Sequence, residues 1–97
     1  MTAVNIAEVV DHYARRGALR AGAERSIGRL NLLIVDADLV LAFDAAMLLP
    51  ITRSAGLSLG DRFCLALAKR LDRPVLTADG AWATVADAVG VRVQLIR

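Results

Sequence analysis

The first third of the chain carries apolar positions at helical spacing. Residues 2–4 read as the end of a short buried strand, and Asn5 can cap the helix that follows. Apolar side chains then recur every three to four residues as far as Gly17, where this helix is expected to end. A weaker helical pattern over residues 18–31, interrupted by two glycines, predicts a second helix.

The rest of the chain alternates between strand and helix signals. The apolar run 32–35 predicts a strand, and Asp36 is placed to cap a long helix that runs to Gly56 and is kinked or broken at Pro50. The later elements are expected to be a helix over 58–71, a strand over 74–77, a short helix over 81–88 and a last strand over 91–96. This order predicts an α/β domain with a mostly parallel sheet and helices on both faces.

Composition supports one domain over residues 1–97. The chain has 97 residues, 57% of them apolar, and a mean hydropathy of +0.52, which excludes a disordered chain. So high a hydropathy in a small domain indicates that some apolar surface meets a partner or a missing piece of the fold. No uninterrupted apolar run reaches the roughly 20 residues of a membrane-spanning helix, no signal peptide is visible, and the single Cys64 favours a reducing cytoplasm. The net charge of +2 permits RNA as a substrate without arguing for it.

Three acidic residues fall where helices follow strands. Asp79 comes two residues after Thr77, whose hydroxyl at the strand end can orient a carboxylate or a metal-bound water. Glu8 lies in the first turn after residues 2–4, and Asp61 lies in the first turn of a helix. Because ligands bind beyond the carboxyl ends of parallel strands, these carboxylates are expected within about 10 Å of each other. Oxygen ligands without a His or Cys cluster favour Mg²⁺ or Mn²⁺.

Each of these residues also has a purely structural interpretation. Asp61 follows Ser58 by three residues and can complete a capping box, and Asp79 can serve as a turn or helix cap. Glu8 can be a solvated charge on a polar helix face. Gly60 is unfavourable in a first helical turn, which indicates that something approaches the backbone closely there.

Three sequence blocks carry a family resemblance. They are Ala3–Val9, Leu57–Arg62 followed by Cys64–Ala68, and Pro74–Asp79 with Trp82. In this order and spacing they resemble the second, third and fourth motifs of PIN-domain ribonucleases, the VapC-type toxins of bacterial toxin–antitoxin pairs. The likeness covers essentially the whole chain.

The resemblance implies a metal-dependent endoribonuclease. Glu8, Asp61 and Asp79 would take the positions of the second, third and fourth acidic residues and bind one or two Mg²⁺ or Mn²⁺ ions that activate water. Arg62 would meet RNA phosphate, or instead form a helix-surface ion pair. The partners implied are a cognate VapB-like antitoxin, a single-stranded or structured RNA substrate, and a second copy in a homodimer.

One part of the family pattern has no counterpart. The pattern begins with a central strand that ends in an Asp, so the chain is expected to be the C-terminal portion of a PIN-like domain, with uncovered apolar surface and weak or no activity. Asp36 matches a helix-capping position and is not assigned to the site. Two alternatives remain open: a non-catalytic remnant that binds antitoxin or dimerises, and a receiver-like phosphoacceptor domain, which the position of Lys69 in a helix disfavours.

Other residues with reactive or aromatic side chains are given structural roles. His12 is expected on the surface, although its spacing from Glu8 would let both touch one metal. Cys64 is expected to be an inert buried thiol. The aromatic residues are too scattered for a base-stacking platform and are expected in the core: Tyr13, Phe43, Phe63 and Trp82.

Overall fold

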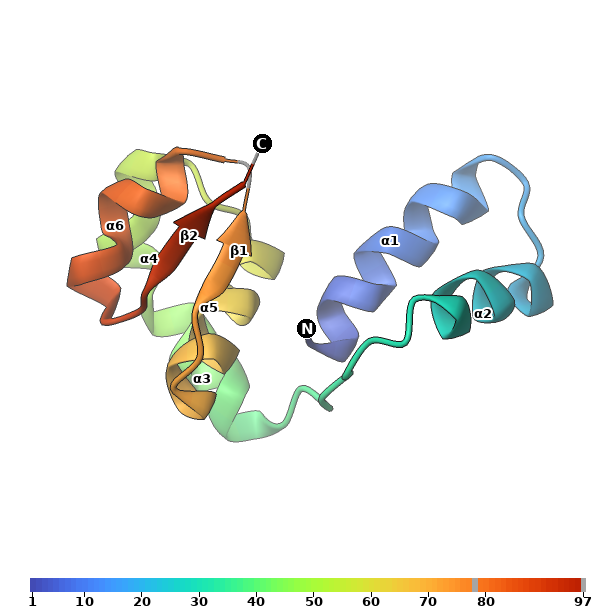
Figure 1. Cartoon of the computed structure of the whole chain (residues 1–97), viewed down its shortest axis with the longest axis horizontal. Helices are drawn as coiled ribbons and strands as arrows, with labels where there is room; N and C mark the ends of the chain where they lie inside the picture. The colour runs from blue at the N-terminus through green and yellow to red at the C-terminus, as the bar shows by residue number, and fades with distance from the viewer. Residues whose placement is uncertain (78, 97) are drawn as a thin grey trace.

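The computed structural model describes residues 1–77 and 79–96. Two helices form a hairpin at the N-terminus, an extended segment follows, and the remaining helices gather around a short sheet (Figure 1). In chain order the elements are α1 (Ala3–Arg15), α2 (Arg20–Arg29), α3 (Leu39–Met47), α4 (Leu49–Thr52), the 3₁₀ turn η1 (Arg53–Ala55), α5 (Leu59–Leu71), β1 (Val75–Thr77), α6 (Ala81–Val89) and β2 (Val93–Leu95).

Helix α1 begins earlier than its sequence pattern predicts. Thr2 is the N-cap: its hydroxyl accepts from the Asn5 backbone N–H at 3.3 Å, and Asn5 Oδ1 accepts from the Thr2 backbone N–H at 3.0 Å. Asn5 as the cap was therefore wrong, because this reciprocal pair satisfies the helix start three residues earlier. The predicted strand over 2–4 is reduced to one parallel bridge between Thr2 and Val35.

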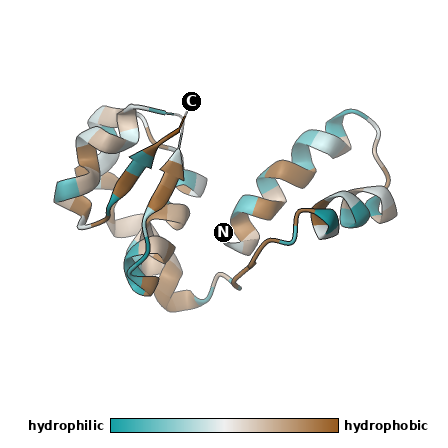
Figure 2. Cartoon of the chain, in the orientation of Figure 1, coloured by the Kyte–Doolittle hydropathy of each residue, from teal (hydrophilic) through white to brown (hydrophobic). Residues whose placement is uncertain are grey.

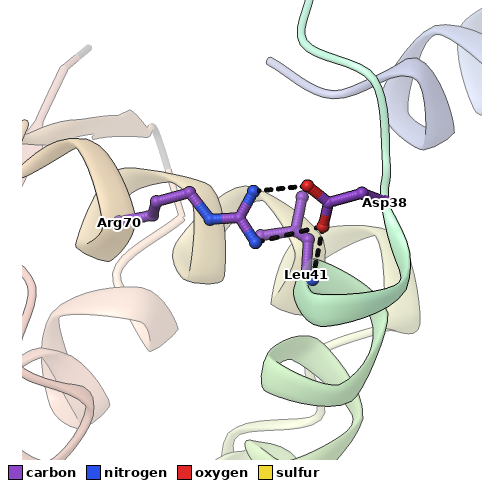
Figure 3. Close-up of polar contacts among 3 residues, drawn as sticks. All are labelled: Asp38, Leu41 and Arg70. Carbon is purple, nitrogen blue, oxygen red and sulfur yellow. Dashed lines mark hydrogen bonds and ion pairs between the residues drawn. The ribbon is translucent and has the colours of Figure 1, made fainter.

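Helix α3 begins later than predicted. Its N-cap is Asp38, whose Oδ1 accepts from the Leu41 backbone N–H at 2.8 Å, so Asp36 as the cap was wrong. Asp38 also receives two hydrogen bonds from Arg70 at 3.0 and 3.1 Å (Figure 3). The helix breaks at Leu48, and Pro50 lies in the first turn of α4, where its missing N–H costs nothing. The helix is therefore broken close to Pro50, as predicted, but at Leu48, two residues before the proline.

The sheet is a parallel pair. β1 and β2 align Val75 with Val93 and Thr77 with Leu95, α6 connects them, and α5 packs on β1. The helix over 58–71 is confirmed, with Ser58 as its N-cap, and both late strands lie inside their predicted ranges. The predicted α/β fold class is confirmed, although the described residues are mostly helical.

The hydrophobic core lies in the C-terminal two-thirds of the chain. It is built from α3, α5 and α6 with the strands beside them, whereas α1 contributes no buried residue and α2 only Ala23. Figure 2 shows apolar residues spread over both parts of the molecule. Many of them are exposed, in agreement with the uncovered apolar surface that the sequence predicts.

Part of that surface is a hollow of about 320 Å³ beside β1. Met1 and the segment 32–35 line one side, β1 lines the other, and α5 contributes Cys64, Leu67 and Ala68. Val75 N–H bonds to Arg92 O and Thr77 O accepts from Ile96 N–H, both on the β2 side. In a parallel strand the hydrogen-bonding direction alternates, so the N–H and carbonyl of Leu76 point to the edge of β1 that faces away from β2. Leu76 itself is 61% exposed.

Among the described residues no single helix is both long and apolar enough to span a membrane. Within residues 1–77 and 79–96, one bent pair of helical segments, Leu39–Ala55 with Leu59–Leu71 at 117°, reaches that length and composition.

Candidate functional site

Glu8 of α1 reaches the start of α5. Its carboxylate lies against Gly60, at the place where any other residue would carry its Cβ; an ideal Cβ built there collides with Glu8, whose Oε2 is 2.5 Å away. Gly60 is buried, and α1 and α5 pack together. The prediction that something approaches the backbone at Gly60 is confirmed, and the approaching group is a predicted site residue.

Asn5 holds α1 against the start of α5, next to the contact between Glu8 and Gly60. Its Nδ2 donates to the Gly60 carbonyl at 2.9 Å, while its Oδ1 accepts from the backbone N–H and hydroxyl of Thr2. Asn5 lies three residues before Glu8 on α1, so both side chains fall on the same face of the helix. The sequence analysis missed this positioning role. The available signal was the Thr-x-x-Asn spacing, which places an amide at the third helical position of a capping box.

Asp61 is both a helix-capping residue and a candidate metal ligand. Its Oδ2 accepts from the Ser58 backbone N–H at 3.0 Å, and its own N–H donates to Ser58 Oγ at 3.2 Å. The capping box considered for Asp61 therefore exists. Asp61 is half-buried, and the residue before it is the one that Glu8 contacts. Asp61 thus places a negative charge in the first turn of α5, where the helix dipole favours it.

Asp79 orders the turn between β1 and α6. Its Oδ1 accepts from the Ala81 backbone N–H at 2.9 Å, and its own N–H donates to Thr77 Oγ1 at 3.1 Å. The cap interpretation of Asp79 is therefore also present. Thr77 holds Asp79 through the backbone, and the carboxylate is exposed.

The three predicted metal ligands lie on or beside three different helices: Glu8 on α1, Asp61 on α5 and Asp79 just before α6. Among residues 1–77 and 79–96, no three Asp, Glu, His or Cys side chains form a group that could hold one metal ion. Glu8 contacts Gly60, the residue before Asp61 in the sequence, and the proximity of the three carboxylates to one another stays a prediction. The residue types fit a hard divalent cation, since all three candidate ligands are carboxylates and Gly60 leaves room for the carboxylate of Glu8.

Arg62 is engaged elsewhere. Its Nη1 donates to the carbonyls of Ala45 and Ala46, both at 3.3 Å, at the C-terminal end of α3. A cation at a helix C-terminus can hydrogen-bond the last carbonyls and interacts favourably with the helix dipole. Its Nε is buried without a hydrogen-bond partner. The geometry gives Arg62 a structural partner in place of the surface ion pair considered from sequence, and a contact with RNA phosphate stays a prediction.

The remaining reactive and aromatic residues divide between confirmed and corrected expectations. His12 is exposed, as expected of a surface histidine. Burial raises the pKa of the Cys64 thiol, which agrees with an inert thiol. Phe63 and Trp82 lie in the core as predicted. The other two aromatic predictions were wrong, because the exposed fraction is 37% for Tyr13 and 64% for Phe43.

Together these features define an α/β protein with a parallel pair of strands and acidic residues at the starts of α5 and α6. The chain belongs to the PIN domain family, whose family model matches residues 1–88. PIN domains are in general metal-dependent nucleases. No curated protein and no solved structure matches the chain. Family membership sets aside the receiver-domain alternative.

Proposed function

We propose that this protein is a Mg²⁺- or Mn²⁺-dependent endoribonuclease of the VapC toxin type. The observation that carries the proposal is the contact of the Glu8 carboxylate with Gly60, the residue before Asp61 in the sequence. Glu8 and Gly60 are separated by more than half of the chain, and the packing of α1 on α5 places the exposed Glu8 side chain at the first turn of α5. Family membership supports nuclease chemistry in general.

In this proposal the metal is held by Glu8, Asp61 and Asp79. When bound, the cation supplies activation of water for attack on a phosphodiester. The chain's own contribution is to fix the carboxylates: Asn5 ties α1 to α5 beside Glu8, and backbone N–H groups hold one oxygen each of Asp61 and Asp79. Such preorganisation matters because the ligand atoms of a metal site must be held within about 0.5 Å of their productive positions.

We further propose that full activity needs a strand ending in an Asp, seated in the hollow between segment 32–35 and β1. The α5 residues that line the hollow are apolar. The N–H and carbonyl of Leu76 face the hollow from β1. A strand there would extend the sheet and bring a fourth carboxylate to the carboxyl end of β1. Without it the 97-residue chain is expected to cleave RNA weakly or not at all.

The proposed biological setting is a cytoplasmic toxin–antitoxin pair. The substrate is single-stranded or structured RNA, a VapB-like antitoxin covers the site, and the toxin forms a homodimer. A small open reading frame just upstream in the genome would support this setting.

The activity test compares the chain alone with the chain extended upstream through a strand ending in Asp. Single-stranded RNA is incubated with Mg²⁺ or Mn²⁺, with and without EDTA. The extended protein should cleave only with metal, and Asp61→Asn and Asp79→Asn should abolish cleavage while preserving the fold, because Asn still accepts the capping hydrogen bonds. Asp87→Asn, an exposed change on α6, is the matched control and should leave cleavage intact. Cleavage that is unaffected by EDTA, or full activity of both Asn variants, would contradict the metal-dependent nuclease proposal.

A second measurement separates an enzyme from a non-catalytic remnant. Substoichiometric Mn²⁺ broadens NMR signals close to its binding site. Amides around Glu8, Asp61 and Asp79 should broaden together, and the signals around Asp87 should not. A remnant without a metal site would show only weak broadening scattered over exposed acids.

A further inference from the structure

Two arginines tie α5 to α3, one at each end of the helix pair. Arg62, at the start of α5, donates from Nη1 to the carbonyls of Ala45 and Ala46 near the C-terminal end of α3, both at 3.3 Å. Arg70, near the other end of α5, donates to Asp38 at the N-cap of α3 at 3.0 and 3.1 Å (Figure 3). The two arginines lie about 12 Å apart along the helix, so each fixes a different end of the packing between α3 and α5.

Packing alone does not explain an arginine at position 62. Its Nε is buried and, among the residues that the structure describes, has no hydrogen-bond partner. An unpartnered buried donor lowers stability, whereas an apolar side chain of similar length would fill the same space without that cost. The Ala45 carbonyl also accepts from the Leu48 N–H, so it does not depend on Arg62 for a partner. What the guanidinium adds is the connection between α5 and α3.

This connection fixes the turn that carries Asp61. On one side of Asp61, the Gly60 carbonyl accepts from Asn5 of α1 at 2.9 Å. On the other side, Arg62 is held by the end of α3. Asp61 therefore stands between two residues that are anchored to different helices, and its own Oδ2 accepts from the Ser58 N–H at 3.0 Å.

The same contacts direct the positive charge of Arg62 to α3. Within residues 1–77 and 79–96, the structure has no ion pair between Arg62 and Asp61. Such a pair would offset the negative charge that a hard cation requires of its ligands. The C-terminal end of α3, where the helix dipole is negative, holds the guanidinium instead. The charge of Asp61 is therefore not neutralised by its neighbour in the sequence.

We infer that Arg62 is a positioning residue for Asp61, acting through α3 and not by contact with RNA phosphate. The inference rests on the proposed nuclease function, since it gives Arg62 a part in presenting a proposed metal ligand. Ligand atoms must be held within about 0.5 Å of their productive positions. Removing one of the two anchors beside Asp61 should therefore weaken metal binding even where the fold survives.

Amide hydrogen exchange in the metal-free chain, measured where amides exchange by local opening, tests the positioning directly. Arg62→Met keeps a long side chain and removes its hydrogen bonds to α3. The Asp61 amide, which donates to Ser58 Oγ, should then exchange about fivefold faster or more. Arg70→Met is the matched control, because it makes the same change at the other end of the helix. It should speed exchange at Leu41, whose N–H donates to Asp38, and leave Asp61 as in the wild type.

Calorimetric titration with Mn²⁺ then connects the turn to the site. Arg62→Met should weaken Mn²⁺ binding about tenfold or more, as loss of a residue that orients a metal ligand does. Arg70→Met should keep the wild-type affinity. Arg62→Lys, which retains a charged donor for one carbonyl, should recover part of the loss.

Two results would overturn the inference. One is equal acceleration of Asp61 exchange in Arg62→Met and Arg70→Met. The other is wild-type Mn²⁺ affinity in Arg62→Met combined with weaker binding of a labelled single-stranded RNA in fluorescence anisotropy, which would make Arg62 a direct RNA contact. If Asp61→Asn leaves Mn²⁺ binding unchanged, the metal site of the nuclease proposal fails by itself, and the exchange measurement still decides the role of Arg62.

Discussion

Replacing Gly60 with alanine should separate stability from metal binding. Gly60 lies in the first turn of α5 without a positive φ, so alanine fits the backbone and gains up to about 1 kcal/mol of helix propensity. The new Cβ collides with the Glu8 carboxylate. That carboxylate ends a flexible, exposed side chain and can swing away at small cost.

The expected displacement is small in distance and large in consequence. Glu8 Oε2 is 2.5 Å from the position of the new Cβ and Oε1 is closer still, so the carboxylate must retreat by roughly 1.5 Å to reach ordinary van der Waals contact. A shift of that size exceeds the tolerance of about 0.5 Å for a functional ligand set. Loss of Glu8 as a ligand should weaken Mn²⁺ binding about tenfold or more, which corresponds to about 1.4 kcal/mol. The fold should meanwhile melt at the same temperature or a few degrees higher.

Calorimetric titration with Mn²⁺ and thermal unfolding without metal measure the two effects. Gly28→Ala is the matched control, because Gly28 is also helical and nothing lies within 4 Å of a Cβ built there. Gly28→Ala should gain stability and keep the Mn²⁺ affinity of the wild type. Wild-type Mn²⁺ affinity in Gly60→Ala would show that Glu8 is no ligand. A large loss of stability would show that Glu8 is held rigidly and that the reasoning about its mobility is wrong.

Two further predictions concern the helix caps. Ser58→Ala removes the hydroxyl that accepts from the Asp61 N–H, so it should cost about 1 kcal/mol and lower the melting temperature by about 4–8 °C in thermal denaturation. The hydrogen bonds from Arg70, with that from Leu41 N–H, hold the pKa of Asp38 below its ordinary value. A depressed carboxyl pKa stabilises the fold above the unfolded value of about 3.9, and this stabilisation is lost as the pH falls through the folded pKa. Asp38→Asn should therefore be less stable than wild type in urea at pH 6, with the difference vanishing near pH 2; a constant difference over this range would contradict the Arg70 explanation.

The sequence predicts elements best where local signals decide them. The helix over 58–71 begins at a Ser-x-x-Asp box, and its capping partners lie within one turn, so no distant residue is needed. The strands over 2–4 and 32–35 depend on pairing across the fold, and in the structure they retain only the bridge between Thr2 and Val35. Pairing of this kind is invisible to periodicity, because it requires knowledge of which neighbour lies alongside.

The candidate site was predictable to a similar extent. An unfavourable glycine at position 60 indicated a close approach, but its partner Glu8 lies 52 residues away and only the packing of α1 on α5 identifies it. Phe43 was placed in the core because its helix is apolar, and a pattern that is apolar on both sides contains no information about which side is buried.

The carboxylates that begin helices determine which substitutions can report on function. Asp61 gives Oδ2 to the Ser58 N–H, and Asp79 gives Oδ1 to the Ala81 N–H, so each side chain supports a turn that also aims it. Alanine at either position would remove a cap and a candidate ligand together, and a loss of cleavage would then have two explanations. Asparagine keeps an acceptor oxygen for the cap and removes only the negative charge that a hard cation requires. Loss of Mn²⁺ binding in an asparagine variant with an unchanged melting temperature therefore identifies a ligand, whereas unchanged binding identifies a residue that serves only the fold.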